Sequence, residues 1–292
     1  MSTEVEPNHE AVPHVLFERD GRVARIILNR PDQLNALTTS MMKIISERLQ
    51  EYESDDGVHV VVFRGNGRAF CTGADIEEVA RIYEDASAHK DRREINKLGL
   101  WFQRNLWEFS KPTILELKGY CYAGANFFLS YCDLVVASED ALIAASENRG
   151  FALEPSMGMW PLTVGMRWTK ALFFTGDAID GKTAERIGMI NKALPLEELE
   201  SYVDWFAQKI AKTDLPLLTL HKQAVNMVFD ILGVYPMLKA GLAFDHMAHR
   251  DSKFNELLER VRRDGAREAF KWVYALNDEP SFLDGPKKDK KL

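Results

Sequence analysis

Two turns rich in small residues, each following a run of hydrophobic residues, carry the clearest chemical signal in the sequence. The first covers residues 68–75 (RAFCTGAD), and the second opens residues 118–133 (KGYCYAGANFFLSYCD) and leads into an apolar helical segment. Turns this poor in side chains let backbone N–H groups face a ligand, and a helix start favours negative charge there. One such turn alone usually serves tight packing. Two of them can supply two N–H donors to a single oxyanion, so the pair indicates an oxyanion-binding site.

The elements that must position these turns follow an alternating pattern. A hairpin with its turn at Asp20–Gly21 is predicted near the N-terminus, followed by short apolar strands of the kind that is buried on both faces of a parallel sheet. Helical periodicity separates these strands, most extensively over residues 76–109. Alternation at this spacing predicts βαβ units and an α/β fold. The strands expected after the hairpin cover residues 58–63, 113–117, 133–137 and 142–145.

The pattern becomes mostly helical after Pro161, and it ends in a long, highly charged helix expected over residues 251–276. We therefore expect a division of the chain by residue range. The ranges are a disordered tail (1–13), a core domain (14–205), a helical region (206–280) and a flexible basic tail (281–292).

Composition limits the class of function. The 292 residues are 46% hydrophobic and 28% charged, with a net charge of −7 and an isoelectric point of about 5.6. This acidic balance argues against nucleic acid or an anionic membrane as the main partner. No segment resembles a signal peptide or reaches the roughly 18 apolar residues of a membrane span. The three cysteines (Cys71, Cys121 and Cys132) follow no metal spacing, so we expect reduced thiols in a cytoplasmic protein.

The sequence offers no motif for a metal or a nucleotide. Residues 65–67 (GNG) are interpreted as a turn and not as a phosphate-binding loop. His221, His246 and His249 lie in the helical half without a partner motif, and we interpret them as structural or surface residues. We therefore expect no metal and no separate cofactor.

Five groups of residues, taken in order, resemble the crotonase superfamily, the enoyl-CoA hydratase/isomerase family, over residues 15–275. The resemblance implies a spiral of ββα repeats that ends in a helical trimerisation region, assembled as a trimer or a dimer of trimers. It also implies an acyl-CoA thioester as substrate, with coenzyme A bound as part of that substrate. The matching pieces are 29–31 with 34–37 (NRP and LNAL), 69–76 (AFCTGADI), 111–133, 175–177 (TGD) and 184–188 (AERIG).

The same resemblance assigns roles to individual residues. It maps the two oxyanion-hole donors to the backbone N–H groups of Ala74 and Gly124, the turns already identified above. Residues with an aromatic ring around the acyl group suit a bulky or aromatic acyl chain, or equally an ordinary packed core; they include Tyr122, Phe127 and Trp160. The expected coenzyme A contacts are mostly main-chain, and fall on Leu34, Ala36, Thr72, Asp75 and Ile76.

The acid/base groups depart from the family pattern. Typical hydratases carry two glutamates, and Phe127 stands where the first is expected, while Glu147 falls on the second. The resemblance is therefore to a single-glutamate variant, with Glu147 as general acid/base or, alternatively, a surface residue before a turn. Asn126 is able to hydrogen-bond a water, but a helix-start role fits it better. Glu154, at the rim of the expected acyl pocket, is either a second carboxylate or a loop residue.

These residues leave several functions open. The first is an enoyl-CoA hydratase, or a hydratase that also cleaves a carbon–carbon bond, which is a lyase. The alternatives are a Δ3-Δ2-enoyl-CoA isomerase and a CoA-thioester hydrolase. An acyl-CoA-binding paralogue with impaired catalysis represents a different class, and the missing first glutamate is the reason to consider it.

Overall fold

The computed structural model describes residues 13–84, 87–90, 96–149, 152–153, 159–275 and 279–284. All but the last residue of the expected N-terminal tail, and residues 285–292 of the expected basic tail, lie outside this description.

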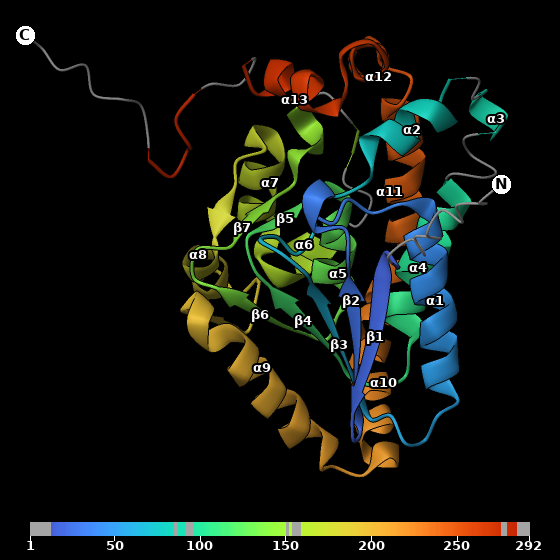
Figure 1. Cartoon of the computed structure of the whole chain (residues 1–292), viewed down its shortest axis with the longest axis vertical. Coiled ribbons are helices and arrows are strands. Elements are labelled where there is room, and N and C mark those ends of the chain that lie inside the picture. The colour runs from blue at the N-terminus through green and yellow to red at the C-terminus, as the bar shows by residue number, and fades with distance from the viewer. Residues whose placement is uncertain are drawn as a thin grey trace, which may run out of the picture.

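A six-stranded sheet forms the centre of the molecule (Figure 1). Its strand order is β1-β2-β3-β4-β6-β9; β1 and β2 form the predicted antiparallel hairpin, and every later pairing is parallel. Gly21 makes the hairpin turn with a φ of +58°, a conformation that glycine adopts without strain. The strands are β1 (Val15–Asp20), β2 (Val23–Leu28), β3 (Val60–Gly65), β4 (Thr113–Leu117), β6 (Leu134–Ser138) and β9 (Lys192–Leu194).

A second, smaller sheet continues from the ends of these strands. It consists of β5 (Tyr120–Tyr122), β7 (Leu142–Ala144) and β8 (Ile179–Asp180), with β7 in the middle. A bridge between Cys71 and Cys121 connects the first small-residue turn to β5. The chain passes from β4 into β5 and from β6 into β7, and the turn after β3 pairs with β5, so the two turns meet at this edge.

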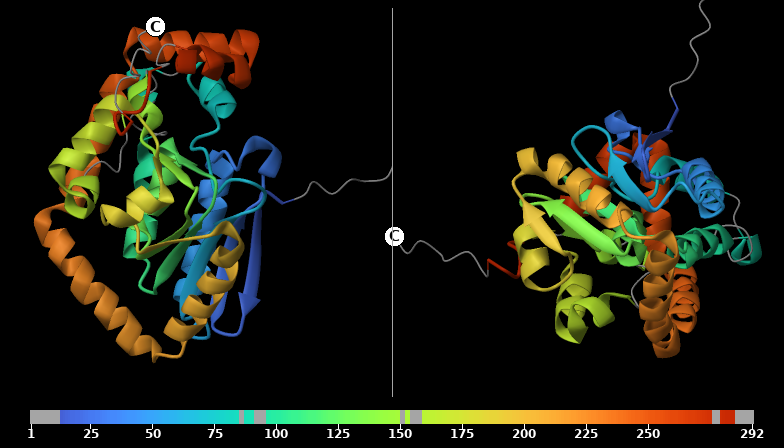
Figure 2. Two further views of the ribbon diagram at one scale, coloured as in Figure 1. Left: turned by 90° about the vertical axis from the view of Figure 1, so that its left-hand side faces the viewer. Right: turned by 90° about the horizontal axis from the view of Figure 1, so that it is seen from below.

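Helices cover both faces of the large sheet. On one face, α1 (Thr39–Glu53), α4 (Asn96–Glu108) and α5 (Asn126–Tyr131) enclose the main hydrophobic core, where Phe63, Phe102 and Phe128 are fully buried. Their rings pack with centroids 5.2 to 5.4 Å apart, and burial of each contributes about 2–3 kcal/mol. On the other face lies α9 (Leu196–Ala211) (Figure 2). Its apolar side chains pack on Val23 of β2 and on Val60 and Val62 of β3.

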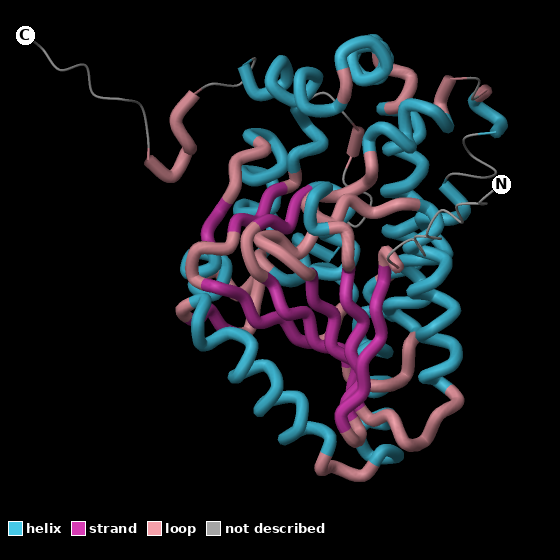
Figure 3. The backbone as a smooth tube through the Cα atoms, in the orientation of Figure 1, coloured by secondary structure: helices cyan, strands magenta, loops and turns pink. Residues whose placement is uncertain are grey.

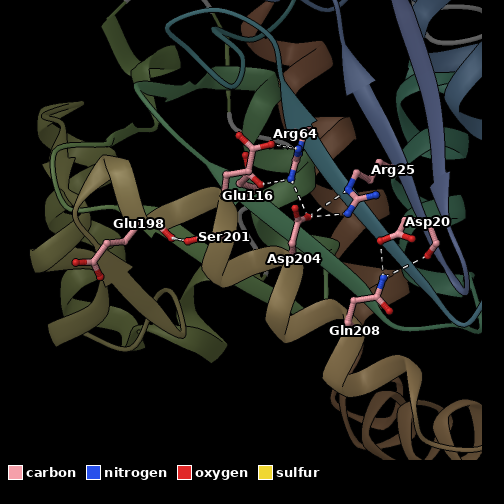
Figure 4. Close-up of polar contacts among 9 residues, drawn as sticks. Asp20, Arg25, Arg64, Glu116, Glu198, Ser201, Asp204 and Gln208 are labelled. Carbon is pink, nitrogen blue, oxygen red and sulfur yellow. Dashed lines mark hydrogen bonds and ion pairs between the residues drawn. The ribbon is translucent and has the colours of Figure 1, made fainter.

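The interface between α9 and the sheet also contains charged groups (Figure 4). Arg64 on β3 donates to Glu116 on β4 at 2.7 Å and to Glu200 on α9 at 2.8 Å, and Asp204 accepts from Arg25 at 2.8 Å. Burial raises the pKa of Glu116, although Arg64 opposes this. Burial also disfavours the charge on Arg64, yet its three carboxylate neighbours raise the pKa of the guanidinium. We refer to these five residues as the α9 ion network.

In the helical half, helices are interrupted at positions where the sequence predicts continuous helices (Figure 3). The predicted helix over 251–276 is wrong as one piece, because Gly265, with a φ of +82°, separates α12 (Ser252–Asp264) from α13 (Ala266–Ala275). The predicted helical stretch over 76–109 contains three described helices, α2 (Ile76–Ile82), α3 (Ala88–Lys90) and α4. The other helices of this half are α6 (Met159–Thr163), α7 (Gly165–Thr175), α8 (Gly181–Arg186), α10 (Leu215–Leu232) and α11 (Val234–Ala248).

Helix α10 is apolar without being covered. None of its residues is buried, and Leu220 and Ile231 have exposed fractions of 60% and 80%. In the described part of the chain no single helix is long and apolar enough to cross a membrane; α10 and α11, bent by 56° at their junction, meet that test only as a pair, by length and composition.

The last two helices pack on α2. Phe254, Leu257 and Val261 of α12 and Val273 of α13 form a separate buried cluster with Ala80 of α2. The guanidinium of Arg262 also donates to the carbonyl oxygen of Ala80, at 2.8 and 3.1 Å. The C-terminal helices therefore fix the position of the short helix that follows the first small-residue turn.

Candidate active site

The two small-residue turns pack directly against each other. The N–H of Cys71 donates to the carbonyl of Tyr120 at 3.0 Å, and the N–H of Tyr122 donates back to Cys71 at 3.2 Å. Gly73 lies so close to the second turn that a Cβ at this position would stand 2.9 Å from the nitrogen of Gly124. Its φ of +95° excludes other residues as well. Glycine at residue 73 is therefore required for the turns to meet.

The backbone nitrogens of Ala74 and Gly124 are neighbours in this arrangement. An ideal Cβ built on Gly124 would lie 3.4 Å from the Ala74 nitrogen. Ala74 pairs with Leu37, but that bridge uses the carbonyl of Gly73 and the N–H of Asp75, so the N–H of Ala74 is not part of it. Among the described residues, neither the Ala74 nor the Gly124 N–H has a hydrogen-bond acceptor.

The second turn supports the Gly124 donor with a strained backbone. Gly124 is the middle residue of a 3-10 turn, Ala123–Ala125, which leads directly into α5. Ala123 has a φ of +50°, a left-handed conformation that costs a non-glycine residue on the order of 1 kcal/mol. Strain of this kind is maintained only where the surroundings fix it. Together with the free N–H groups it gives the geometry of a two-donor oxyanion hole.

A polar cluster fixes the residues that are expected to contact coenzyme A. Arg30 pairs with Asp75 at 2.8 Å and donates to the carbonyl of Ala36 at 2.6 Å. The Asp75 carboxylate also accepts the N–H of Glu78 and so caps α2, which begins at Ile76.

The loop after β2, which contains the short 3-10 turn Pro31–Gln33, turns sharply at the next expected contact, Leu34, and lies beside Thr72. Leu34 has a φ of +50°, and the hydroxyl of Thr72 lies 3.5 Å from its carbonyl oxygen. Asn35, with a φ of +57°, is fully buried and donates to the carbonyls of Asn66 and Ala69, both at 2.9 Å. The structure thus brings Leu34, Ala36, Thr72, Asp75 and Ile76 to one edge of the first turn.

Glu147 lies in a 3-10 turn, Ser146–Arg149, directly after β7. Only 7% of its surface is exposed, so the interpretation of a surface glutamate before a turn is wrong. Its neighbour Arg149 forms an ion pair with Asp177 at 3.1 Å. The guanidinium of Arg149 also lies 5.8 Å from the ring centroid of Tyr274 on α13.

Phe127 and Asn126 begin α5, beside the Gly124 donor. The Phe127 ring would lie 3.7 Å from a Cβ on Gly124, and it packs against Phe102 with centroids 6.3 Å apart. Asn126 is fully buried, and its side chain donates to the carbonyl of Ala144 at 3.0 Å. This contact ties α5 to β7, so the helix-start interpretation of Asn126 fits the structure. An apolar ring therefore stands next to the oxyanion donors, where a second carboxylate would stand in a two-glutamate site.

The remaining aromatic candidates occupy different surroundings. Tyr122 is half-buried, on the face of β5 opposite Cys121, with its ring 5.3 Å from that of Tyr120. Burial, helped by the neighbouring phenols of Tyr274 and Tyr120, raises the pKa of Tyr122, so its hydroxyl stays protonated and able to donate. Trp160 is 2% exposed and packs against Phe173 with centroids 5.1 Å apart. Glu154, the possible second carboxylate, lies outside the described residues.

The fold and this arrangement of donors define a class of protein. The sequence profile of the enoyl-CoA hydratase/isomerase family matches residues 18–255. The chain belongs to this family. The crystal structure of an enoyl-CoA hydratase/isomerase from Xanthobacter autotrophicus Py2 superimposes with a TM-score of 0.85 at 29% identity, covering 91% of this chain and 99% of that one. The expected crotonase fold is confirmed.

Curated relatives point to the same chemistry. The short-chain-enoyl-CoA hydratase of Clostridium acetobutylicum is 31% identical over 239 residues, which are 80% of this chain and 87% of that protein. The mitochondrial enoyl-CoA hydratase of Pongo abelii is 28% identical over 247 residues, covering 82% of both chains. The family acts on acyl-CoA thioesters, which agrees with the expected substrate class.

Sequence reasoning missed the residues that hold the site in place. Arg30 lies in the NRP motif but gave no sign of its partners, because Asp75 and Ala36 are brought to it only by the fold. The dependence of α2 on α12 and α13 was equally invisible, since the contacting residues lie far apart in the sequence.

Proposed function

We propose that the protein acts on an enoyl-CoA thioester, with Glu147 transferring the proton and the N–H groups of Ala74 and Gly124 binding the thioester oxygen. The observation that carries this proposal is the pair of neighbouring backbone donors without an acceptor among the described residues. Such donors stabilise the enolate that forms when a proton leaves the carbon beside the thioester, or when water adds to the double bond. One donor of this kind typically contributes about 3 kcal/mol to lowering the barrier.

Hydration is the first candidate reaction, because it is the reaction in the names of the relatives. It adds the elements of water across the double bond, and with a suitable acyl group it leads on to carbon–carbon cleavage. In this chain the hydration would proceed with Glu147 as the carboxylate that activates the water and returns the proton.

A second candidate is the Δ3-Δ2 isomerisation of the double bond, and the position of Phe127 favours it. A ring at the entrance to α5 cannot hold or activate a water, and it removes water from the neighbourhood of the enolate. Isomerisation needs no water, since one carboxylate removes a proton from one carbon and returns it to another. Glu147 alone is sufficient for this reaction.

The acyl group is proposed to be bulky or aromatic. The half-buried rings of Tyr120, Tyr122 and Phe127 close to the donor turns support this, because flat side chains favour flat ligands. Trp160 does not add to this support, since its ring packs in the core against Phe173.

The test is turnover of a panel of thioesters by the wild type and by Glu147→Gln. The panel contains short, long, cinnamoyl-like and polycyclic enoyl-CoA compounds with the double bond at either position, and each product is identified by mass and by double-bond position. We expect activity on at least one compound, and a fall in kcat of about two orders of magnitude or more in the variant. Glu139→Gln, at an exposed ion pair with Lys182, is the control and should keep full activity.

Each product distinguishes one reaction. A gain of one water indicates hydration, an unchanged mass with a moved double bond indicates isomerisation, and free coenzyme A with an intact acid indicates a hydrolase. Full activity of Glu147→Gln would contradict the role given to Glu147 and direct attention to Glu154. Tight binding of acyl-CoA without turnover across the whole panel would indicate the impaired paralogue.

A homotrimer or a dimer of trimers is the proposed assembly, and α10 supports it. Side chains of Leu220, Val225 and Ile231 are more than half exposed along this helix, and burying them against another copy removes a large apolar area from water. Light scattering at several protein concentrations tests the proposal; a monomer at all concentrations would contradict it. The location is proposed to be cytoplasmic, supported by three buried free thiols.

A further inference from the structure

A chain of polar contacts connects α2, the helix after the Ala74 donor, with the segment that follows Glu147, by way of helix α11. Tyr83 ends α2, the helix that starts just after the Ala74 donor, and its hydroxyl lies 2.7 Å from Nδ1 of His249. Nε2 of the same imidazole lies 3.4 Å from Oδ1 of Asp245, one helical turn earlier on α11. That carboxylate oxygen also accepts the backbone N–H of Leu153, at 3.0 Å.

Leu153 belongs to the segment that carries the proton-transferring group. The N–H of Ala152, its neighbour, donates to the carbonyl oxygen of Glu147 at 3.2 Å. Asp245 therefore holds the chain one residue beyond a direct contact with the backbone of Glu147. The polar chain runs from the end of α2, through α11, to the turn of Glu147.

The imidazole of His249 is held tightly between its neighbours. It stacks on Phe254 with centroids 4.5 Å apart and planes inclined by 24°, and it meets Tyr83 edge-on at 5.1 Å. The side chains of both His249 and Asp245 are only 10% exposed. A neutral imidazole with its proton on Nε2 satisfies both contacts, because Nδ1 then accepts from the tyrosine and Nε2 faces the carboxylate.

Apolar side chains would hold α2 against α11 at a lower desolvation cost than these polar groups, of which His249 and Asp245 have side chains only 10% exposed. Buried polar groups fix direction and distance, because each loses its hydrogen bond if the elements shift by about 1 Å. A reaction at two backbone donors and one carboxylate depends on such fixed distances, since small displacements of the reacting groups lower the rate strongly. The interpretation of His249 as a surface residue is therefore incomplete, since its ring is enclosed and bonded.

We propose that Tyr83, His249 and Asp245 form a positioning relay that couples the oxyanion-hole helix α2 to the turn carrying Glu147. The relay rests on the proposed function of Ala74, Gly124 and Glu147, and none of its residues contacts the reacting atoms. Loss of one link lowers kcat, because the distance between the oxyanion donors and the Glu147 carboxylate is no longer fixed. KM changes little, because the expected coenzyme A contacts lie at the start of α2, where the Arg30–Asp75 ion pair holds them at the end of the helix away from the relay.

The first experiment is a double-mutant cycle with Tyr83→Phe and Asp245→Asn. Each single variant should lower kcat about 10-fold with KM within about twofold, and the double variant should be no slower than the worse single variant. Effects that multiply to about 100-fold would show independent roles and overturn the relay. Tyr202→Phe on α9 is the matched control, because it removes a phenol oxygen on the opposite side of the sheet and should leave kcat unchanged.

Substitutions of His249 separate the two links. Asparagine places an amide nitrogen near the position of Nδ1 and can keep the contact with Tyr83, whereas glutamine reaches the position of Nε2 and can keep the contact with Asp245. A relay needs both links, so both variants should be about as slow as His249→Ala. Full rescue by either one would overturn the proposal.

Hydrogen exchange tests the relay without any activity. In the wild type the amides of residues 79–83 and of Leu153 should be protected, and Tyr83→Phe should speed exchange at Leu153 as well as in α2. Faster exchange in α2 with an unchanged Leu153 would contradict the coupling. An enzyme inactive on every thioester, with coupled exchange intact, would contradict the proposed function and leave the relay standing.

Discussion

The α9 ion network and the candidate site are built on the same parallel strands, but their polar groups differ in pairing. On the α9 face, the charged groups of Arg64, Glu116 and Asp204 are paired at 2.7 to 3.2 Å, and the side chains of Arg64 and Glu116 are at most 11% exposed. At the turn edge, the N–H groups of Ala74 and Gly124 have no acceptor in the described part of the chain. Paired polar groups hold the fold together, and unpaired donors mark the place where a ligand completes the pairing.

The difference also appears in backbone conformation. The strands under α9 are regular, whereas Leu34, Asn35 and Ala123 around the turns adopt left-handed conformations that only Asn accepts at modest cost. Strain has thus been concentrated where chemistry is proposed and kept out of the region that carries stability.

Gly124→Ala should break the site while leaving the fold intact. The added methyl would sit 3.4 Å from the Ala74 nitrogen and 3.7 Å from the Phe127 ring, which are ordinary contacts, but it would occupy the space of the thioester oxygen. We expect kcat to fall by about 10²- to 10³-fold, the loss typical of an oxyanion hole, with an unchanged unfolding midpoint. Steady-state kinetics and thermal unfolding measure both.

The matched control for that variant is Gly99→Ala on α4. It makes the same chemical change, and its methyl would meet only Leu242, at 3.9 Å. Retained activity in Gly124→Ala, or an equal loss in Gly99→Ala, would show that the turn donors do not bind the oxygen.

Glu116→Gln should do the reverse, lowering stability without affecting the chemistry. It leaves the buried Arg64 without its main partner, and loss of one member of a buried ion pair costs about 3 kcal/mol. Urea unfolding at one fixed protein concentration measures the loss, and kcat per folded molecule should stay within about twofold. The double replacement Arg64→Met with Glu116→Leu should recover most of the stability. A double variant as unstable as the single one would mean that packing, and not the charge pair, is what α9 requires.

The smallest expected effect is a loss of folding stability at alkaline pH, caused by the thiol of Cys71 in the first turn. Burial raises the pKa of the Cys71 thiol to about 12, from an ordinary value of 9.0. A raised pKa in the folded state means that the stabilisation is complete below pH 9 and is lost as the pH rises toward 12. Between pH 8 and pH 10 the loss attributable to this thiol is about 1.4 kcal/mol.

Cys71→Ala isolates that contribution. The variant should lose about 1.4 kcal/mol less than the wild type over the same interval, measured by urea unfolding at both pH values. Parallel losses in the two proteins would mean that Cys71 does not titrate differently in the folded state.

The sequence was sufficient for the parts of the molecule that are encoded locally. The Asp20–Gly21 hairpin, the apolar strands and the two small-residue turns each have a short-range signal, and all are present in the structure. Glu147 was found by its distance from the second turn, which only a family resemblance supplies.

Other features depend on residues that the fold brings together from distant positions. The division of the last helix at Gly265 was missed, because a single glycine inside a helical period is also tolerated without a break. The contacts of His249 with Tyr83 and Phe254 could not be predicted, since Tyr83 lies in a different part of the chain and no spacing links the two. The burial of Glu116 on β4 was equally hidden, because a charged residue inside a strand normally indicates an exposed face.

The packing of α12 and α13 on α2 bears on the order in which the protein acquires activity during synthesis. Every proposed catalytic group lies within residues 74–147, yet α2 is held by Phe254, Val261 and Arg262, which a ribosome adds after all of them. A chain that stops before α12 would contain the oxyanion turns and Glu147 but would lack the helices that fix one of them. We therefore expect the proposed thioester chemistry to start only after α12 and α13 have been added and have packed on α2.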